Sequence, residues 1–293
     1  MRAFLTTSEH TLAQAVQRFS FFKKGRLKFD RYQNGELYVS DCSLVRSQRC
    51  VLIGSMTPPD NQMMRTLLGA HTLKKEGAKQ VIGLFPYLAY TRHDKKKSGE
   101  SLTTAWIGAL VKASGIDEII TIDLHSKEDH KQIPIPIVSL SPAKLFAKEI
   151  RIRRLENATF VAPDKGAIER CTSVCKAAGN TSNLVYFKKQ RGPQGVILSN
   201  PIGKVGDRAV IIDDILDTGE TMLGACERLQ KAGVKEIYIL VTHGLFNGKK
   251  WKRLRAFGVR EIVCCDTVNL EIKNRWISTI STTSIIRDYF KQK

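Results

Sequence analysis

The fold is most readily recognised from residues 210–221, which read VIIDDILDTGET. The first three residues are apolar and β-branched, which predicts a buried strand, and the carboxylates Asp213 and Asp214 follow it directly. The last five residues, DTGET, begin an amphipathic stretch that continues to Lys231 and predicts a helix. A strand-to-helix turn of this kind lies at the carboxyl edge of a parallel sheet, where ligands bind.

This turn combines chemical groups that suit a sugar phosphate. Backbone N–H groups at a helix start, together with the hydroxyls of Thr218 and Thr221, can form a cradle for a phosphate group. The paired carboxylates of Asp213 and Asp214 suit vicinal sugar hydroxyls or a metal ion. The alternative is a capping turn without a ligand, but two carboxylates at the buried end of a strand are costly for capping alone. The pattern therefore favours a ligand-binding turn.

Strands and helices alternate along the rest of the chain. Each predicted strand is a short apolar run rich in β-branched residues, and each predicted helix is a longer amphipathic stretch. The predicted strands include residues 51–53, 81–85, 119–122, 159–161, 210–212, 237–241 and 262–263, and the predicted helices include residues 63–75 and 221–231. This alternation predicts an α/β fold in which helices flank parallel sheets.

An internal repeat divides the chain into two related halves. Residues 73–81, LKKEGAKQV, resemble residues 229–237, LQKAGVKEI, and in each copy a glycine ends a helix before a strand begins. Further along, residues 114–120, SGIDEII, parallel residues 257–263, FGVREIV. Because the matches occur in the same order, they indicate duplication of one fold.

The length of 293 residues also fits two domains. The repeat places them at residues 1–141 and 142–293. After the corresponding strand, the first half has Gly54 and Ser55 in place of the acidic pair. The ligand-binding turn is therefore expected in the second half only.

Composition narrows the class of protein. A hydrophobic content of 42% is enough for a substantial core, and no apolar run is long enough for a transmembrane helix. The first residues lack the apolar stretch of a signal peptide. The seven cysteines are irregularly spaced, which indicates buried free thiols in a reducing compartment. We therefore expect a cytoplasmic protein with no membrane partner.

The net charge of +19 favours anionic partners. Polyphosphate substrates, an acidic protein and nucleic acid all fit this charge. The basic residues are spread along the whole chain, and no nucleic-acid recognition motif accompanies them. Nucleic acid is therefore an unlikely partner.

The segment at residues 210–221 resembles the ribose-5-phosphate loop shared by type I phosphoribosyltransferases and ribose-phosphate diphosphokinases. A simple phosphoribosyltransferase would lack the first half of the chain and its ATP motifs. The segments that resemble diphosphokinase motifs are residues 31–36 (RYQNGE), 85–96 (FPYLAYTRHDKK), 123–126 (DLHS), 163–167 (PDKGA), 189–191 (KQR) and 242–246 (THGLF). The chain therefore resembles the ribose-phosphate diphosphokinase family.

This resemblance implies two type I phosphoribosyltransferase-like domains, the first binding ATP and the second binding ribose 5-phosphate. It implies transfer of the diphosphoryl group of Mg-ATP to the anomeric hydroxyl of ribose 5-phosphate, which yields 5-phosphoribosyl 1-diphosphate and AMP. The active site is expected between the domains and partly at a subunit contact of a homo-oligomer.

The resemblance also assigns ATP-binding residues in the first half. Tyr32 would stack on adenine, and Asn34 and Glu36 would bond its polar edge. Arg92 would reach the ATP phosphates, with His93 beside it in the same loop. From the residues alone, Tyr32 fits equally well as a turn aromatic packed on the core, and Arg92 as part of a solvated charged loop.

For metal binding and catalysis the resemblance indicates four residues. His125 and Asp164 would hold Mg²⁺, which bridges ATP phosphates, although a lone histidine is more often structural. Lys189 would stabilise the transition state, and Arg191 would share that role and bind the ribose-phosphate side. The Gly192-Pro193 sequence predicts a loop here. Taken alone, the basic residues of this segment indicate only a charge cluster on the surface.

The resemblance places the ribose 5-phosphate site at residues 210–221. Asp213 and Asp214 would hold the ring hydroxyls, and the 5-phosphate would rest on Thr218, Gly219 and Thr221. The full set of residues that the resemblance implies for this substrate is Arg191, Asp213, Asp214, Asp217, Thr218, Gly219, Glu220 and Thr221.

Three departures from the family pattern stand out. His93 replaces a usual glutamine, and residues 98–102, SGESL, replace the usual sequence after the ATP loop. Glu220 stands where the phosphate loop commonly has glycine or a small residue, and a carboxylate beside a phosphate is unhelpful unless its side chain points away. None of the three removes an expected catalytic residue.

Two alternatives to an active enzyme remain. One is a non-catalytic paralogue that regulates an active diphosphokinase, which would usually carry a broken Lys-x-Arg motif or metal site. The other is a nucleic-acid-binding protein, whose binding would weaken steeply with salt.

Overall fold

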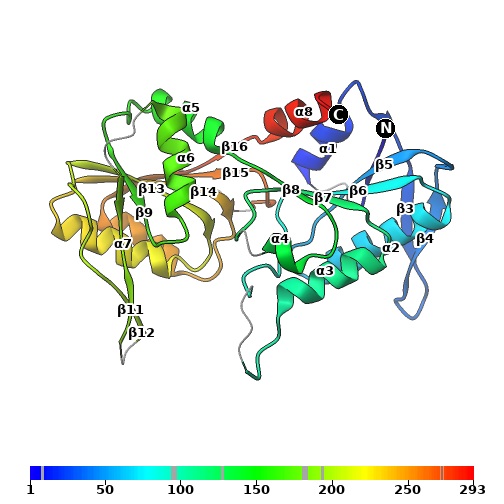
Figure 1. Ribbon diagram of the computed structural model, residues 1–293, viewed down its shortest axis with the longest axis horizontal. Coiled ribbons are helices and arrows are strands. Elements are labelled where there is room, and N and C mark those ends of the chain that lie inside the picture. Colours follow the sequence, from blue (N-terminus) through cyan, green and yellow to red (C-terminus); the bar gives the residue numbers. More distant parts are fainter. Residues whose placement is uncertain are drawn as a thin grey trace. The chain divides into compact units, whose positions relative to one another are not determined.

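The computed structural model describes residues 1–7, 10–93, 98–126, 129–179, 184–192, 195–270, 272 and 274–293, without the side chains of residues 129–130, 189–192 and 195–197. The chain divides into two compact units (Figure 1). Unit 1 comprises Met1–Leu140 and Thr283–Lys293, and unit 2 comprises Ser141–Thr282. No helix in these described ranges is both long enough and apolar enough to cross a bilayer.

Unit 1 is built on a sheet of six parallel strands. In spatial order these are β2 (Lys23–Lys24), β1 (Arg2–Leu5), β5 (Arg49–Ile53), β6 (Gln80–Phe85), β7 (Glu118–Ile122) and β8 (Ile137–Leu140). The central strands are buried on both faces, which explains their nearly continuous apolar sequences. A separate antiparallel hairpin of β3 (Leu27–Arg31) and β4 (Leu37–Cys42) lies between β2 and β5 in the sequence.

Helices cover both faces of this sheet, because successive strand residues point to opposite sides. The helices of unit 1 are α1 (Thr11–Gln17), α2 (Asn61–Lys75), α3 (Thr103–Ala113), α4 (Asp129–Gln132) and α8 (Thr283–Lys291). The face that includes Leu52 packs against α2 and α3. The opposite face, which includes Ile53, packs against α1 and α8.

Helix α8 belongs to unit 1 although it comes last in the sequence. Ile286 and Phe290 on its apolar face are buried against the sheet and α1. Glu118 of β7 accepts hydrogen bonds from the Tyr289 hydroxyl at 3.1 Å and from Lys293 Nζ at 2.7 Å. The domain boundary predicted at residues 141/142 places this helix in the second domain, whereas the structure places it in unit 1. Its amphipathic pattern predicts a buried face but does not specify which sheet the face covers.

Unit 2 has a second sheet of six parallel strands. In spatial order these are β10 (Leu184–Tyr186), β9 (Thr159–Ala162), β13 (Arg208–Leu216), β14 (Glu236–Gly244), β15 (Val259–Cys265) and β16 (Ile277–Ile280). Its helices are α5 (Ala143–Ile152), α6 (Ile168–Ala178), α7 (Glu220–Lys231) and the 3₁₀ helix η1 (Lys250–Phe257). Helices α5 and α6 cover one face of the sheet, and α7 and η1 cover the other (Figure 1).

The two sheets share one topology. In each, the second strand in the sequence is at the edge, the first lies beside it, and the later strands follow in order. In each unit an antiparallel hairpin interrupts the chain after the second strand. The predicted α/β fold of two similar domains, each with a parallel sheet flanked by helices, is therefore confirmed. All seven cysteines lie within the described residues and none forms a disulfide, and six of them are buried, as their spacing predicted.

The predicted extent of one strand was wrong. Strand β13 does not end before Asp213 but continues to Leu216, because its pairing with β14 runs on to Gly244. The segment of the expected catalytic loop includes two strands. Strands β11 (Lys189–Gly192) and β12 (Gly195–Leu198) form an antiparallel hairpin separate from the main sheet (Figure 1).

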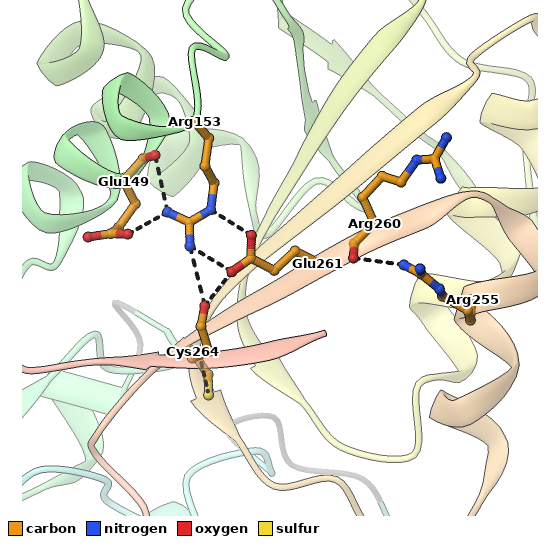
Figure 2. A network of polar contacts seen from close by, with 7 residues as sticks. Glu149, Arg153, Arg255, Arg260, Glu261 and Cys264 are labelled. Carbon is orange, nitrogen blue, oxygen red and sulfur yellow. Dashed lines mark hydrogen bonds and ion pairs between the residues drawn. The ribbon is translucent and has the colours of Figure 1, made fainter. Parts of the chain in front are cut away.

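A network of ion pairs ties α5 to β15 within unit 2 (Figure 2). The Arg153 guanidinium donates to both Glu261 oxygens, at 2.8 and 2.7 Å, and to Glu149 at 2.5 Å. Ser278 of β16 donates to the same Glu261 carboxylate at 2.7 Å. These hydrogen bonds lower the pKa of Glu261, chiefly through Arg153. The stability from this carboxylate is therefore present above its unfolded pKa and is lost as the pH falls through its folded pKa.

An Arg153→Met variant should have a free energy of unfolding about 2–3 kcal/mol lower than that of the parent, because two partly buried carboxylates lose this cation. Urea denaturation measures the difference. Arg260→Met is the matched control, because Arg260 adjoins Glu261 on β15 but forms an exposed pair with Glu236 at 3.3 Å. Equal effects of the two substitutions would contradict a structural role for the network.

Candidate functional site

The carboxyl end of β13 holds a buried pair of carboxylates. Asp213 and Asp214 belong to the strand itself, and they are only 9% and 5% exposed. Strand β13 runs between β9 and β14, and the strand order reverses between β9 and β13. In open α/β sheets, ligands bind outside the carboxyl ends of strands at such a reversal. The strand places both acidic side chains at this position.

Arg170 of α6 faces both carboxylates. Its Nη1 lies 3.7 Å from Asp213 Oδ1, and its Nη2 lies 3.7 Å from Asp214 Oδ2. The guanidinium side chain is 11% exposed, so these charges interact largely out of water. Sequence reasoning missed Arg170. The sequence did offer one signal for it. Arg170 lies in the helix that follows β9, and β9 is the strand beside β13.

Burial raises the pKa of Asp213 well above its usual range, and the neighbouring Asp214 carboxyl raises it further. The Arg170 guanidinium opposes this shift. Asp164 also contributes to the raised pKa, which places its carboxylate in the same electrostatic environment. Negative charge on these neighbouring carboxyl groups is therefore costly, and a hydroxyl-bearing or cationic ligand would offset that cost.

Asp164, a predicted metal ligand, lies just beyond the end of β9. Its Oδ1 accepts a hydrogen bond from the backbone N–H of Ala167 at 3.2 Å, at the start of α6. The side chain is partly buried. Unit 2 thus brings three predicted site carboxylates, those of Asp164, Asp213 and Asp214, to adjacent strand ends.

The predicted phosphate turn lies between β13 and α7. Thr218 is exposed and Thr221 is half-buried, and helix α7 begins after Gly219 without a side-chain cap. The first N–H groups of a helix have no partner within the helix, so they can bind an anion. Gly219 has φ +86°, and a Cβ there would lie 2.8 Å from Trp251 Cα. Glycine is therefore required by both conformation and space.

Asp217 and Glu220, the acidic residues of this turn, each have a partner from the segment after β14. Asn247 Nδ2 donates to Asp217 Oδ1 at 2.6 Å. Lys250 Nζ lies 3.3 Å from Glu220 Oε1. Sequence reasoning missed both partners, because they follow the turn by about 30 residues and carry no motif.

The equivalent position in unit 1 is filled. After β5, a Cβ on Gly54 would lie 2.6 Å from the Thr66 hydroxyl and 2.8 Å from the Thr6 hydroxyl. Thr66 is fully buried and hydrogen-bonds to the Ser55 carbonyl at 3.2 Å. The turn after β5 thus lacks acidic residues, and threonine side chains occupy the space beside Gly54. Of the two turns, only the one in unit 2 is acidic.

The predicted adenine-binding residues occupy the β3–β4 turn in unit 1. Tyr32 is 58% exposed and stacks on Tyr38, with ring centroids 4.4 Å apart. It is therefore not packed on the core, which was the alternative. Asn34 Oδ1 accepts from the backbone N–H of Glu36 at 3.1 Å, so Asn34 also shapes the turn.

Arg92 and His93 are exposed on the segment that follows β6. The His93 carbonyl accepts a hydrogen bond from Thr104 Oγ1 at 3.2 Å, at the start of α3. The lysines after His93 lie outside the described residues. The structure therefore places both predicted ATP-binding residues on a segment anchored to α3.

His125, the other predicted metal ligand, lies past the end of β7 and is exposed. The preceding Asp123 has φ +50° and donates its N–H to the Leu140 carbonyl at 2.9 Å. Among the described residues, no three His, Cys, Asp or Glu side chains form a metal-binding group. His125 belongs to unit 1 and Asp164 to unit 2.

Lys189 and Arg191, the predicted catalytic residues, lie on strand β11. Their side chains fall outside the described part of the structure. The backbone pairs Lys189 with Leu198 and Arg191 with Val196. Their contribution to the site therefore remains a prediction from the sequence.

Comparison with known proteins adds independent findings. A family model described as the N-terminal domain of ribose phosphate pyrophosphokinase matches residues 1–115, and one described as phosphoribosyl synthetase-associated domain matches residues 173–289. The ribose-phosphate pyrophosphokinase of Ureaplasma parvum serovar 3 is 32% identical, over 83% of this chain and 75% of that protein. The Thermotoga maritima ribose-phosphate pyrophosphokinase is 27% identical, over 98% of this chain and 92% of that protein.

A solved structure shows the same fold. The crystal structure of phosphoribosylpyrophosphate synthetase from Mycobacterium smegmatis matches with a TM-score of 0.86, at 24% sequence identity. The match covers 100% of this chain and 99% of that chain.

Proposed function

Because the chain belongs to the ribose-phosphate pyrophosphokinase family, whose members are also called ribose-phosphate diphosphokinases, we propose that it transfers the diphosphoryl group of ATP to ribose 5-phosphate. The products are 5-phosphoribosyl 1-diphosphate and AMP. One observation carries the proposal. The carboxylates of Asp213 and Asp214 are held opposite Arg170 at the strand-order reversal, and the turn after their strand leads into a helix start without a side-chain cap.

Unit 2 supplies the groups for the acceptor sugar. Asp213 and Asp214 accept hydrogen bonds from the ring hydroxyls of ribose 5-phosphate. The N–H groups at the start of α7 and the hydroxyls of Thr218 and Thr221 bind the 5-phosphate. These contacts orient the anomeric hydroxyl, and orientation is a large part of catalysis in phosphoryl transfer.

Unit 1 supplies the groups for the donor. Tyr32 stacks on the adenine ring, with Asn34 and Glu36 at its polar edge. Arg92 binds the phosphates, and His93 lies beside it in the ATP-binding loop. The anomeric oxygen attacks the β-phosphorus in line, the bond from that phosphorus to the oxygen of the α-phosphate breaks, and AMP leaves. Positive charge from Lys189 and Arg191 stabilises the charge that develops during this transfer.

We propose Mg²⁺ as the cofactor. Magnesium in phosphoryl-transfer sites is usually held by one or two carboxylates, with substrate phosphates and water completing the shell. Asp164 provides such a carboxylate, and His125 is the second proposed ligand. When bound, Mg²⁺ supplies positive charge to the ATP phosphates. A site of this kind does not need three protein ligands.

The test is to incubate the protein with ATP, Mg²⁺ and ribose 5-phosphate and to measure AMP and 5-phosphoribosyl 1-diphosphate. We expect the two products in equal amounts, and none when ribose replaces ribose 5-phosphate, because ribose lacks the phosphate that the α7 start binds. A protein that binds ribose 5-phosphate without forming AMP would be a non-catalytic paralogue. Light scattering tests the accompanying proposal that the chain forms a homo-oligomer.

A further inference from the structure

Residues 247–251 support the phosphate turn of unit 2 through three successive contacts. Asn247 Nδ2 donates to Asp217 Oδ1 at 2.6 Å. The backbone and Cβ of Trp251 approach within 2.8 to 3.1 Å of the position that a Cβ on Gly219 would take. Lys250 Nζ lies 3.3 Å from Glu220 Oε1. One short segment therefore contacts the turn along its length, and only the Lys250 contact carries opposite charges.

Glu220 creates an electrostatic problem for the proposed substrate. It is the first residue of α7, and the partial positive charge of a helix start attracts anions. The carboxylate of an acidic side chain at this position interacts with that partial charge in place of a bound anion. It also repels a phosphate group that approaches the same N–H groups. An unpaired Glu220 carboxylate would thus weaken the phosphate site that it borders.

We propose that Lys250 is a positioning residue for ribose 5-phosphate, which neutralises the Glu220 carboxylate and holds it toward residues 247–251. The inference rests on the proposed function, which puts the 5-phosphate at this helix start. With Lys250 in place, the turn carries a Glu–Lys pair of no net charge beside the phosphate. The N–H groups of α7 then remain attractive to an anion.

Because Lys250 and Glu220 are exposed, a role of their ion pair in ligand binding can be distinguished from a role in folding stability. The side chains of Lys250 and Glu220 are 57% and 75% exposed. Exposed ion pairs contribute little to folding stability, because water screens them and ordering two long side chains costs entropy. Substitution of either residue should therefore change ligand affinity and leave the melting temperature nearly unchanged.

The experiment is calorimetric titration of the full-length parent, Lys250→Met, Glu220→Gln and the double variant with ribose 5-phosphate. For Lys250→Met we expect about threefold to tenfold weaker binding, from the uncompensated charge of Glu220. Glu220→Gln should bind at least as tightly as the parent. The double variant should return to within about twofold of the parent, because the charge that Lys250 neutralises is gone.

Lys231→Met is the matched control. Lys231 forms an exposed pair with Glu227 at 2.7 Å on the same helix, at its far end. This substitution removes one positive charge from α7 without altering the phosphate turn. We expect it to leave ribose 5-phosphate affinity unchanged, which excludes a general effect of net charge.

Three outcomes would overturn the inference. Unchanged affinity in Lys250→Met would show that the pair does not influence the site. An equal loss in the parent and Glu220→Gln backgrounds would show that Lys250 binds the phosphate directly. If the parent itself does not bind ribose 5-phosphate, the proposed function and the inference both fail. The parent titration therefore distinguishes failure of the proposed function from failure of the role of Lys250 alone.

Discussion

An Asp213→Asn variant should be more stable than the parent protein and should lose most of its use of ribose 5-phosphate. Burial raises the pKa of Asp213, and Asp214 raises it further, so the ionised side chain destabilises the fold at neutral pH. Asparagine keeps the size of the side chain and removes the charge. We expect a melting temperature higher by about 2–4 °C for each kcal/mol of repulsion relieved.

Activity should change in the opposite direction. The amide accepts weaker hydrogen bonds from the ribose hydroxyls than a carboxylate does, and a lost bond to a charged group is worth about 1.5–3 kcal/mol. We therefore expect kcat/KM for ribose 5-phosphate to fall about 100-fold. Steady-state kinetics measures this loss, and the KM for ATP should remain close to that of the parent.

The pH dependence gives a further check on Asp213. Because its folded pKa is raised, its contribution to stability is present below the unfolded pKa and is lost as the pH rises through the folded pKa. The advantage of Asp213→Asn should therefore grow with rising pH and vanish in acid. Asp207→Asn, at an exposed pair with Lys235, is the control and should show neither effect. Lower stability of Asp213→Asn at neutral pH would contradict the argument.

An Arg170→Met variant should lose about 3–5 kcal/mol of unfolding free energy, because it leaves two buried carboxylates without their opposing cation. The loss should be largest at neutral pH and should shrink in acid, where one carboxylate takes up a proton. Urea denaturation at several pH values measures it. Use of ribose 5-phosphate should fall as well, because the carboxylates lose the guanidinium that faces them.

The double variant Arg170→Met/Asp213→Asn keeps this prediction testable if the single variant folds poorly. Removal of one carboxylate relieves the repulsion, so the double variant should recover much of the lost stability. Arg170→Lys should retain part of the stability but not the two-pronged geometry of the guanidinium. If the changes in unfolding free energy from Arg170→Met and Asp213→Asn were simply additive in the double variant, the proposed coupling of these side chains would be wrong.

Much of the fold could be predicted from residue patterns. The seven predicted strands all correspond to strands of the two sheets, because a buried parallel strand needs a run of β-branched residues and little else. The edge strand β2 consists of Lys23 and Lys24 and has no such pattern. The extent of β13 was underestimated, because Asp213 and Asp214 resemble loop residues although their backbone groups continue the sheet.

The site was predictable only in part, for a similar physical reason. Asp213, Asp214 and Gly219 lie in one contiguous segment, so their joint chemistry is visible in the sequence. Arg170 and Lys250 contact that segment only because neighbouring elements of the sheet bring them there. A solitary basic residue in a helix carries no local signal of its partner. In a chain with 47 lysines and arginines, such contacts cannot be distinguished from solvated charges.

The return of helix α8 to unit 1 affects the order in which the two units are completed during synthesis. Residues 141–282 contain every strand and helix of unit 2, and they leave the ribosome before α8 does. Until α8 emerges, one apolar face of the unit 1 sheet lacks a helix that buries it with Ile286 and Phe290. Domains generally fold in the order of synthesis. Here the unit that is begun first is the last to be completed, and its nascent sheet stays partly uncovered while the whole of unit 2 is made.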